Sequence, residues 1–119
     1  MGVVLALIGM AGCRGAGTDR SYPVSTGGDR TRGLATIDRA GCGACHDIPG
    51  VRGLHGRLAP SLADFAHRAV IAGILPNSPA NLTRWLLDPP SISPRTAMPV
   101  LGLTDQEARD VAAYLYHLD

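Results

Sequence analysis

Two cysteines three positions apart, with a histidine directly after the second, constrain this chain more than any other feature. The stretch is AGCGACHDIPG, residues 40–50, and it places Cys42, Cys45 and His46 among glycines and alanines. Two thiols and an imidazole on about one turn of chain need a shared chemical use. Three uses fit this set: a structural zinc site, a dithiol redox pair and the covalent attachment of a haem.

The zinc and redox interpretations need partners that the sequence does not supply. A structural zinc site takes four ligands, usually from a second clustered pair, but the remaining cysteine is Cys13 near the N-terminus. A thioredoxin-like pair belongs to a βαβ context, whereas this sequence reads as helices and loops. Cys-x-x-Cys-His is the attachment signature of c-type haem. We therefore predict one haem c, bonded to Cys42 and Cys45, with His46 as an axial ligand of its iron.

A second axial ligand is expected on the opposite side of the ring. Met98 is the one methionine beyond the N-terminal apolar segment, and it lies in a proline-bounded loop about fifty residues after His46. A thioether ligand raises the potential of a histidine-ligated haem and suits electron transfer. Ligation by a second histidine is the alternative, and the available side chains are His55, His67 and His117.

The composition fits a small domain built around a large non-protein group. The 119 residues suffice for one small domain, and one Phe, one Trp and three Tyr give few large side chains for its core. A haem would supply the missing apolar bulk. Eleven basic side chains against ten acidic ones leave no electrostatic surplus, so a nucleic-acid partner is not expected.

An apolar run precedes the predicted domain. VVLALIGMAGC, residues 3–13, is too short to span a bilayer but has the size of the hydrophobic part of a secretory signal. It resembles a bacterial lipoprotein signal, which predicts residues 1–12 as a cleaved signal peptide and Cys13 as the lipidated residue, on the periplasmic side of the cell envelope. A buried helix is the alternative, which the glycines in and around the run disfavour. Residues 13–29, rich in Gly, Ser, Thr and Asp, are expected to be a flexible tether to a domain over residues 30–119.

The first and last helices of that domain are predicted from caps and apolar spacing. Asp29 can cap a helix over residues 30–40, and Thr104 and Glu107 stand at capping-box spacing ahead of the last helix. In the first helix, apolar residues lie at helical spacing at Leu34, Ile37 and Ala40, with Gly33 and Ala35. The last helix would bury one face made of Ala108, Val111, Ala112, Leu115 and Leu118.

A third main helix is predicted between them. Ser78 stands at its cap, Pro79 at its first position and Pro89 at its stop. A short helix is also expected within residues 62–73, and the other segments, rich in Pro and Gly, are expected to be loops. No pair of strands is visible, so the predicted class is all-α, with three main helices and loops wrapped around the haem.

Four stretches carry a family resemblance: GCGACHDIPG, LAPSL, AGILPNSPANLTRWLLDPP and AMPVLGLTDQEARDVAAYL. From about Arg32 to its end, the chain resembles class I cytochromes c, and in detail the cytochrome c domain fused to subunit II of some bacterial haem-copper oxidases. The first stretch and the Met-Pro step belong to the whole class, whereas LPN followed by LTRWLLDP is the narrower signature. The resemblance implies the small cytochrome c fold and a one-electron carrier rather than an enzyme with a small-molecule substrate.

The resemblance also implies roles for further residues. Pro60 matches the proline whose carbonyl accepts a hydrogen bond from Nδ1 of the ligand histidine, which orients that ligand. Arg68 and Trp85 match residues that hydrogen-bond a haem propionate. Gly33 and Tyr114 match the pair at which the first and last helices cross. The alternatives are a solvated arginine, a core tryptophan and an ordinary helix glycine.

The predicted function is electron transfer between membrane-bound respiratory complexes, from a quinol-oxidising complex to a haem-copper oxidase, by a carrier held at the membrane through its lipid anchor. A fixed haem subunit of such a complex is a variant of this prediction. The alternative class is a ligand-binding haem protein, a gas sensor or a peroxidase, with a labile sixth ligand. Near Met98 the sequence offers Arg95 and Thr96 but no histidine, which disfavours a peroxidase. No copper domain is recognised in the 119 residues, so the oxygen-reducing role is not carried over.

Overall fold

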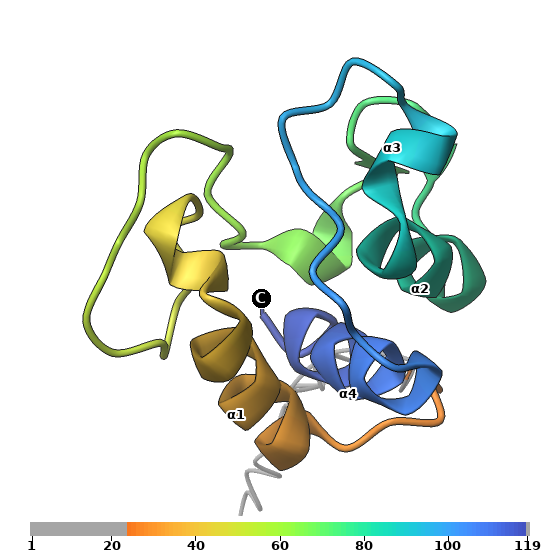
Figure 1. Ribbon diagram of the computed structural model, residues 1–119. Helices are drawn as coiled ribbons and strands as arrows, with labels where there is room; N and C mark the ends of the chain where they lie inside the picture. The colour runs from red at the N-terminus through yellow and green to blue at the C-terminus, as the bar shows by residue number, and fades with distance from the viewer. Residues whose placement is uncertain (1–23, 119) are drawn as a thin grey trace, which may run out of the picture.

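The computed structural model describes residues 24–118 (Figure 1). The predicted signal peptide, Cys13 and the predicted tether up to residue 23 lie outside this range. Within it, helices of nine to eleven residues, α1 (Arg30–Ala40), α2 (Pro79–Leu87) and α4 (Asp105–Leu115), are joined by long loops. None of the helices in this part of the chain is both long and apolar enough to cross a membrane.

The helices α1 and α4 begin at the caps that the sequence predicts. Asp29 Oδ1 accepts from the backbone N–H of Arg32 at 2.9 Å, and Gly41, with φ 73°, ends α1 in the left-handed conformation that glycine tolerates best. At α4, Thr104 Oγ1 accepts from Glu107 N at 3.2 Å, while Glu107 Oε2 accepts from Thr104 N at 2.8 Å. The predicted capping box is therefore confirmed.

The helices α1 and α4 cross in close contact at Gly33. A Cβ on Gly33 would lie 2.0 Å from the backbone oxygen of Asp110 and 3.1 Å from the Cβ of Tyr114. This is the crossing that the resemblance implies. Of the apolar positions in α1, Ala35 is exposed, whereas the neighbouring Thr36 is buried, because the face that meets α4 runs through Gly33, Thr36 and Ile37.

The carboxylate of Asp110 joins α4 to the segment ahead of α1. The side chain is buried and accepts from Asp29 N at 2.7 Å, from Arg32 Nε at 2.9 Å and from Gln106 Nε2 at 3.0 Å. Gln106 Nε2 also donates to the backbone oxygen of Gly27 at 3.1 Å. Residues 27–29 of the predicted tether are thus held against α4, as the orange segment of Figure 1 shows.

The helix α2 begins as predicted and is followed by a further turn. Ser78 Oγ accepts from Asn81 N at 3.3 Å, and Pro79 is the first helical residue. Pro89 was predicted to stop the helix. Instead, α2 ends at Leu87, and Pro89 is the first residue of the one-turn helix α3 (Pro89–Ile92). A proline fits this position because the first turn of a helix does not use its N–H groups within the helix.

Residues 62–73 differ from the prediction. The expected helix is one 3₁₀ turn, η2 (Phe65–His67), followed by a small hairpin of β1 (Val70–Ile71) and β2 (Leu75–Pro76). The prediction of no strand pair was therefore wrong in this detail. Strands of two residues are too short to show an alternating pattern. The chain reverses at Ala72 and Gly73, which both have positive φ.

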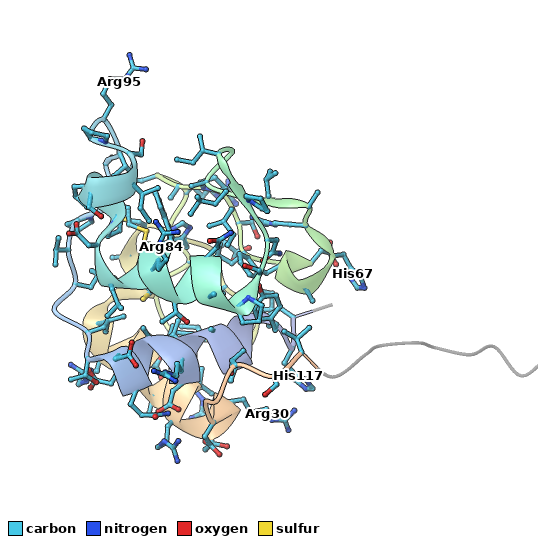
Figure 2. The ribbon with its side chains drawn as sticks, turned by 90° about the vertical axis from the view of Figure 1, so that its right-hand side faces the viewer. Arg30, His67, Arg84, Arg95 and His117 are labelled. Carbon is cyan, nitrogen blue, oxygen red and sulfur yellow. The ribbon has the colours of Figure 1, made fainter. Side chains whose placement is uncertain are left out.

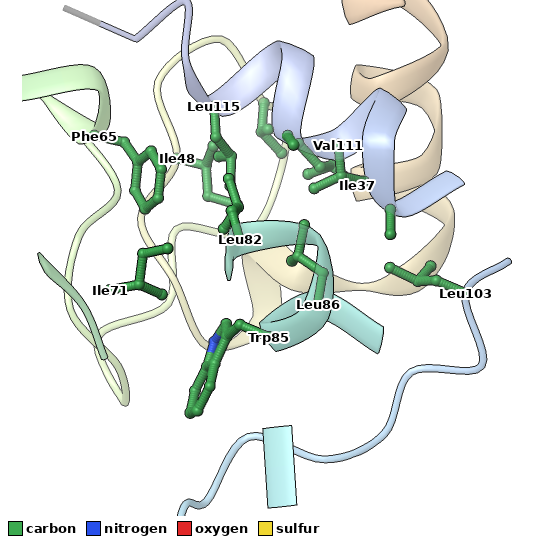
Figure 3. Packing of buried hydrophobic residues seen from close by; sticks show 13 residues of the cluster. Ile37, Ile48, Phe65, Ile71, Leu82, Trp85, Leu86, Leu103, Val111 and Leu115 are labelled. Atoms are coloured by element: carbon green, nitrogen blue, oxygen red, sulfur yellow. The ribbon is translucent and has the colours of Figure 1, made fainter. Parts of the chain in front are cut away.

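The hydrophobic core lies between α1, α2 and α4 and extends to the hairpin (Figure 3). Its buried residues are Ile37, Ile48, Val51, Phe65, Ile71, Leu82, Trp85, Leu86, Leu103, Ala108, Val111, Ala112 and Leu115. Of these, Trp85 is the largest, and its ring points away from α4 at the edge of the cluster (Figure 3). The all-α architecture with three main helices is as predicted.

Candidate haem site

The two cysteines lie on a tight turn directly after α1. The turn is the 3₁₀ element η1 (Cys42–Ala44), and Cys42 O accepts from the backbone N–H of Cys45 at 3.2 Å and of His46 at 3.0 Å. Neither cysteine forms a disulfide. Cys42 is half-buried, and this burial raises the pKa of its thiol, whereas Cys45 is exposed. This short segment therefore carries two free thiols, with the imidazole of His46 directly after the second.

The small residues around the cysteines have a use within the chain. The loop over residues 46–62 folds back onto the cysteine turn, where Gly56 N donates to Gly43 O at 2.9 Å. A Cβ on Gly43 would lie 2.8 Å from Leu54 O, and one on Gly56 would lie 2.3 Å from Ala44 O. These two glycines thus allow two backbone segments to touch at the cysteine turn.

His46 is oriented by a hydrogen bond to a backbone carbonyl. Its Nδ1 lies 2.7 Å from Pro60 O, the contact that the resemblance implies. Because Pro60 O can only accept, Nδ1 carries the proton and Nε2 of the neutral imidazole has its lone pair free. Among residues 24–118 no hydrogen bond engages Nε2. The ring is therefore prepared to ligate a metal through Nε2, with a carbonyl fixing its tautomer.

The segment that carries Pro60 is pinned on both sides of it. We call residues 59–63 the strap. Ala59 N donates to Cys45 O at 3.0 Å, and Leu62 N donates to Asp47 O at 2.8 Å, so the strap is bonded to the residues before and after His46. These two backbone bonds hold the Pro60 carbonyl opposite the imidazole.

Arg68 reaches the strap from the other side. Its Nη2 donates to Ala63 O at 2.9 Å and also to Ser61 O, while its guanidinium carbon lies 5.7 Å from the centroid of the Phe65 ring. Arg68 is half-buried, and its Nε and Nη1 are left for other partners. Arg68, which the resemblance implies as a hydrogen-bond donor to a haem propionate, therefore also bonds to the strap of its own chain.

Met98 and Trp85 lie on the segments that follow the hairpin. Met98 is half-buried and packs against the hydrophobic core, and its backbone N–H donates to Thr96 Oγ1 at 3.2 Å. Trp85 is 8% exposed on α2, at the edge of the same core. Both side chains therefore belong to the apolar interior that α2 and the loop after α3 share.

The other three histidines occupy different surroundings. His55 Nδ1 is paired with Asp47 Oδ1 at 2.9 Å. His67 points outward from η2, and His117 lies beside Arg30, which its Nε2 contacts (Figure 2). All three are exposed, unlike Met98. A second histidine ligand would have to leave these positions.

The donor set fits a covalently bound haem better than a bare metal ion. No group of three or more His, Cys, Asp or Glu side chains converges between residues 24 and 118 in a way that could hold an ion. Two free thiols at a spacing of three, an imidazole with a free Nε2 and a half-buried thioether packed against the core are instead the kinds of group that attach and ligate haem c.

A family model for cytochrome c matches residues 31–119. This chain belongs to the cytochrome c family. Membership implies a covalently bound haem c and a role in electron transfer, and the predicted cytochrome c fold is confirmed.

Three relatives of this cytochrome c are named cytochrome c oxidase subunit 2. The protein of Bacillus sp. (strain PS3) is 37% identical over 100 residues, which are 81% of this chain and 28% of the relative. The protein of Alkalihalophilus pseudofirmus is 31% identical over 88 residues, 73% of this chain and 25% of the relative. That of Bacillus subtilis is 35% identical over 78 residues, 62% of this chain and 22% of the relative. The chain therefore spans about a quarter of the length of the curated relatives it matches.

Sequence analysis missed two polar residues near the site. These residues are Asn77 and Tyr116. Asn77 Nδ2 donates to the backbone oxygen of Arg68, and Asn77 Oδ1 accepts from the hydroxyl of Tyr116 at 2.6 Å. The LPN stretch that contains Asn77 was the available signal, but it indicated only a family likeness. Nothing in the spacing of the sequence links Asn77 to Tyr116, because the two are brought together by the packing of α4.

Proposed function

We propose that this cytochrome c is a one-electron carrier with a single haem c bonded to Cys42 and Cys45 and ligated by His46 and Met98. The orientation of His46 is the observation that carries the proposal. Its Nδ1 is committed to Pro60 O at 2.7 Å, which leaves Nε2 as the ligand atom on the cysteine side of the domain. The half-buried thioether of Met98 supports the second axial position.

The chain's residues would keep a bound haem as a carrier and not as a catalyst. When bound, the haem supplies a one-electron couple of ferrous and ferric iron. His46 and Met98 would occupy both axial positions, so that no substrate reaches the metal. Arg68 Nε and Nη1, together with the Trp85 indole, are proposed as donors to the propionates, whose charge a partly buried site must satisfy.

We propose that electrons pass from a quinol-oxidising complex to a haem-copper oxidase. The similarity to cytochrome c oxidase subunit 2 proteins supports the oxidase end of this path. Lipidation at Cys13 would hold the carrier at the periplasmic face of a bacterial membrane, where a tether raises the effective concentration of membrane-bound partners. Arg52 and Arg57, which follow the cysteine turn and are exposed, would set the rate of encounter more than its lifetime.

Redox titration and rapid kinetics test the function together. The holoprotein should titrate with one electron, stay low-spin in both states, and be oxidised rapidly by membranes with an active haem-copper oxidase, at a rate that falls with salt. Rapid turnover of peroxide, or tight binding of carbon monoxide by the isolated protein, would contradict the carrier and support the ligand-binding alternative. Mass spectrometry of the native N-terminus tests the lipid on Cys13.

A further inference from the structure

Asn77 links the end of α4 to the turn that carries Arg68. Its Nδ2 donates to Arg68 O at 2.9 Å and to Phe65 O at 3.1 Å, and its Oδ1 accepts from Tyr116 Oη at 2.6 Å. The backbone N–H of Asn77 donates to Ala69 O at 3.0 Å. One side chain thus uses both amide hydrogens and its oxygen to hold two carbonyls of the η2 turn against the C-terminal end of α4.

The network is shielded from water on the side of α4. Burial raises the pKa of Tyr116 to about 12, and its ring meets Phe65 edge to face, with centroids 5.7 Å apart. Asn77 itself is half-buried. Hydrogen bonds in such surroundings are costly to leave unmade, because the freed carbonyls would lose their partners without full access to water.

A continuous series of contacts leads from Asn77 to His46. Asn77 bonds to the backbone oxygen of Arg68, and Arg68 Nη2 donates to two strap carbonyls, Ser61 O and Ala63 O. The strap in turn places Pro60 O 2.7 Å from His46 Nδ1. Each step is a direct hydrogen bond or one peptide segment. The strap has backbone bonds of its own to Cys45 and Asp47, so Arg68 adjusts its position and does not alone create it.

We propose that Asn77 is a positioning residue: acting through Arg68 and the strap, it sets the strength of the Pro60–His46 hydrogen bond. This inference rests on the proposed ligation by His46. A stronger bond at Nδ1 makes the imidazole a better donor at Nε2, which stabilises ferric iron and lowers the reduction potential. Asn77 therefore tunes the potential without contact with the haem's ligands.

The test compares Asn77→Ala with Gln106→Ala in the holoprotein. Gln106 is the matched control because its Nε2 also donates to a backbone oxygen, that of Gly27 at 3.1 Å, but none of its side-chain hydrogen bonds leads to Arg68 or the strap. NMR of the reduced protein measures the exchange of the His46 Nδ1 proton. In Asn77→Ala we expect exchange at least about fivefold faster, the factor that corresponds to about 1 kcal/mol, and a higher reduction potential. Gln106→Ala should change neither.

Two further variants separate positioning from charge. Tyr116→Phe removes only the bond to Asn77 Oδ1, so it should shift the exchange rate and the reduction potential in the same direction as Asn77→Ala, but by less. It also provides the test if Asn77→Ala yields no folded holoprotein. Arg68→Lys keeps the positive charge but loses the planar fork. It should accelerate exchange as Asn77→Ala does. If Arg68 acts on the haem by charge alone, Arg68→Lys leaves exchange unchanged.

The outcomes for the inference and for the proposed function are distinct. Equal exchange rates in wild type, Asn77→Ala and Tyr116→Phe, with low-spin spectra throughout, would overturn the positioning role and leave the carrier intact. If the wild type gives neither an NMR signal from the His46 Nδ1 proton nor a low-spin spectrum, the proposed ligation by His46 is itself contradicted.

Discussion

The carbonyl oxygen of Asp110 occupies the position at which Gly33 would carry a side chain. A Cβ on Gly33 would lie 2.0 Å from that oxygen, far inside van der Waals contact. Because the obstacle is backbone within α4, no rotamer change relieves it. The closeness of α1 and α4 therefore depends on one hydrogen atom in place of a methyl group.

Replacing Gly33 with alanine should destabilise the fold although alanine favours helices. The helices must separate, and overpacking of this kind costs about 2 to 3 kcal/mol. Urea unfolding of the holoprotein measures the loss. Ala35→Ser, at an exposed position of the same helix, is the control and should cost about 0.5 kcal/mol or less. Equal stability of Gly33→Ala and wild type would show that the crossing is looser than described.

The buried carboxylate of Asp110 should make stability depend on pH in the acid range. Its hydrogen bond with Arg32, before all other causes, lowers the pKa from 3.8 to about 2. The folded state thus binds fewer protons than the unfolded state at these pH values, so its contribution is complete above about pH 4 and is lost as pH falls towards 2. The free energy of unfolding, measured at several pH values, should show this decrease.

Asp110→Asn should remove that contribution. The variant keeps the shape of the side chain but not its charge, and we expect a loss of about 2 kcal/mol at pH 7 and a weaker decrease between about pH 4 and 2. Asp105→Asn is the control, because Asp105 pairs with Arg109 on the exposed surface of α4, where such pairs contribute under about 0.5 kcal/mol. A similar loss in both variants would argue against a special role for the buried group.

Covalent attachment predicts that haem stays with the polypeptide after denaturation and extraction with acid and acetone. Replacing Cys42 or Cys45 with alanine should greatly reduce the yield of mature holoprotein, because the haem would form much of the apolar interior of so small a domain. Absorbance of the denatured chain after gel electrophoresis measures retention. Haem that extracts from the wild type would refute the thioether bonds.

Ligation by Met98 predicts a specific response to histidine at that position. Met98→His should keep the iron low-spin but lower the reduction potential, since a thioether favours ferrous iron more than an imidazole does. Optical spectra and a potentiometric titration check both. An unchanged spectrum and potential would make Met98 a packing residue, and the second ligand would then be sought among the exposed histidines.

Local signals in the sequence predict the helices well because the caps act over three or four residues. Asp29, Ser78 and the pair of Thr104 and Glu107 all cap as their spacing indicates. Pro89 shows the limit, because a proline that cannot continue one helix is well suited to open the next. The hairpin at Val70 escaped prediction, since two-residue strands have no periodicity to detect.

Contacts local in the chain were predicted around the candidate site, and contacts between distant segments of the domain were missed. The cysteine turn and His46 follow from one motif, and the contact with Pro60 from family likeness. The links from Asn77 to Tyr116 and from Asp29 to Asp110 join residues 39 and 81 positions apart. Such pairs depend on how the helices dock, which spacing along the chain does not encode.

The docking of residues 27–29 onto α4 sets the pivot of whatever is joined ahead of them. An extended residue adds at most about 3.5 Å of reach, so a linker counted up to Arg30 overstates the available radius by roughly 10 Å. A flexible tether, as proposed, would pivot ahead of Gly27, whose carbonyl accepts a hydrogen bond from Gln106 Nε2. For a fusion partner or a surface attached ahead of Gly27, the connecting chain would therefore emerge from the domain beside the first turn of α4, whatever the composition of the linker.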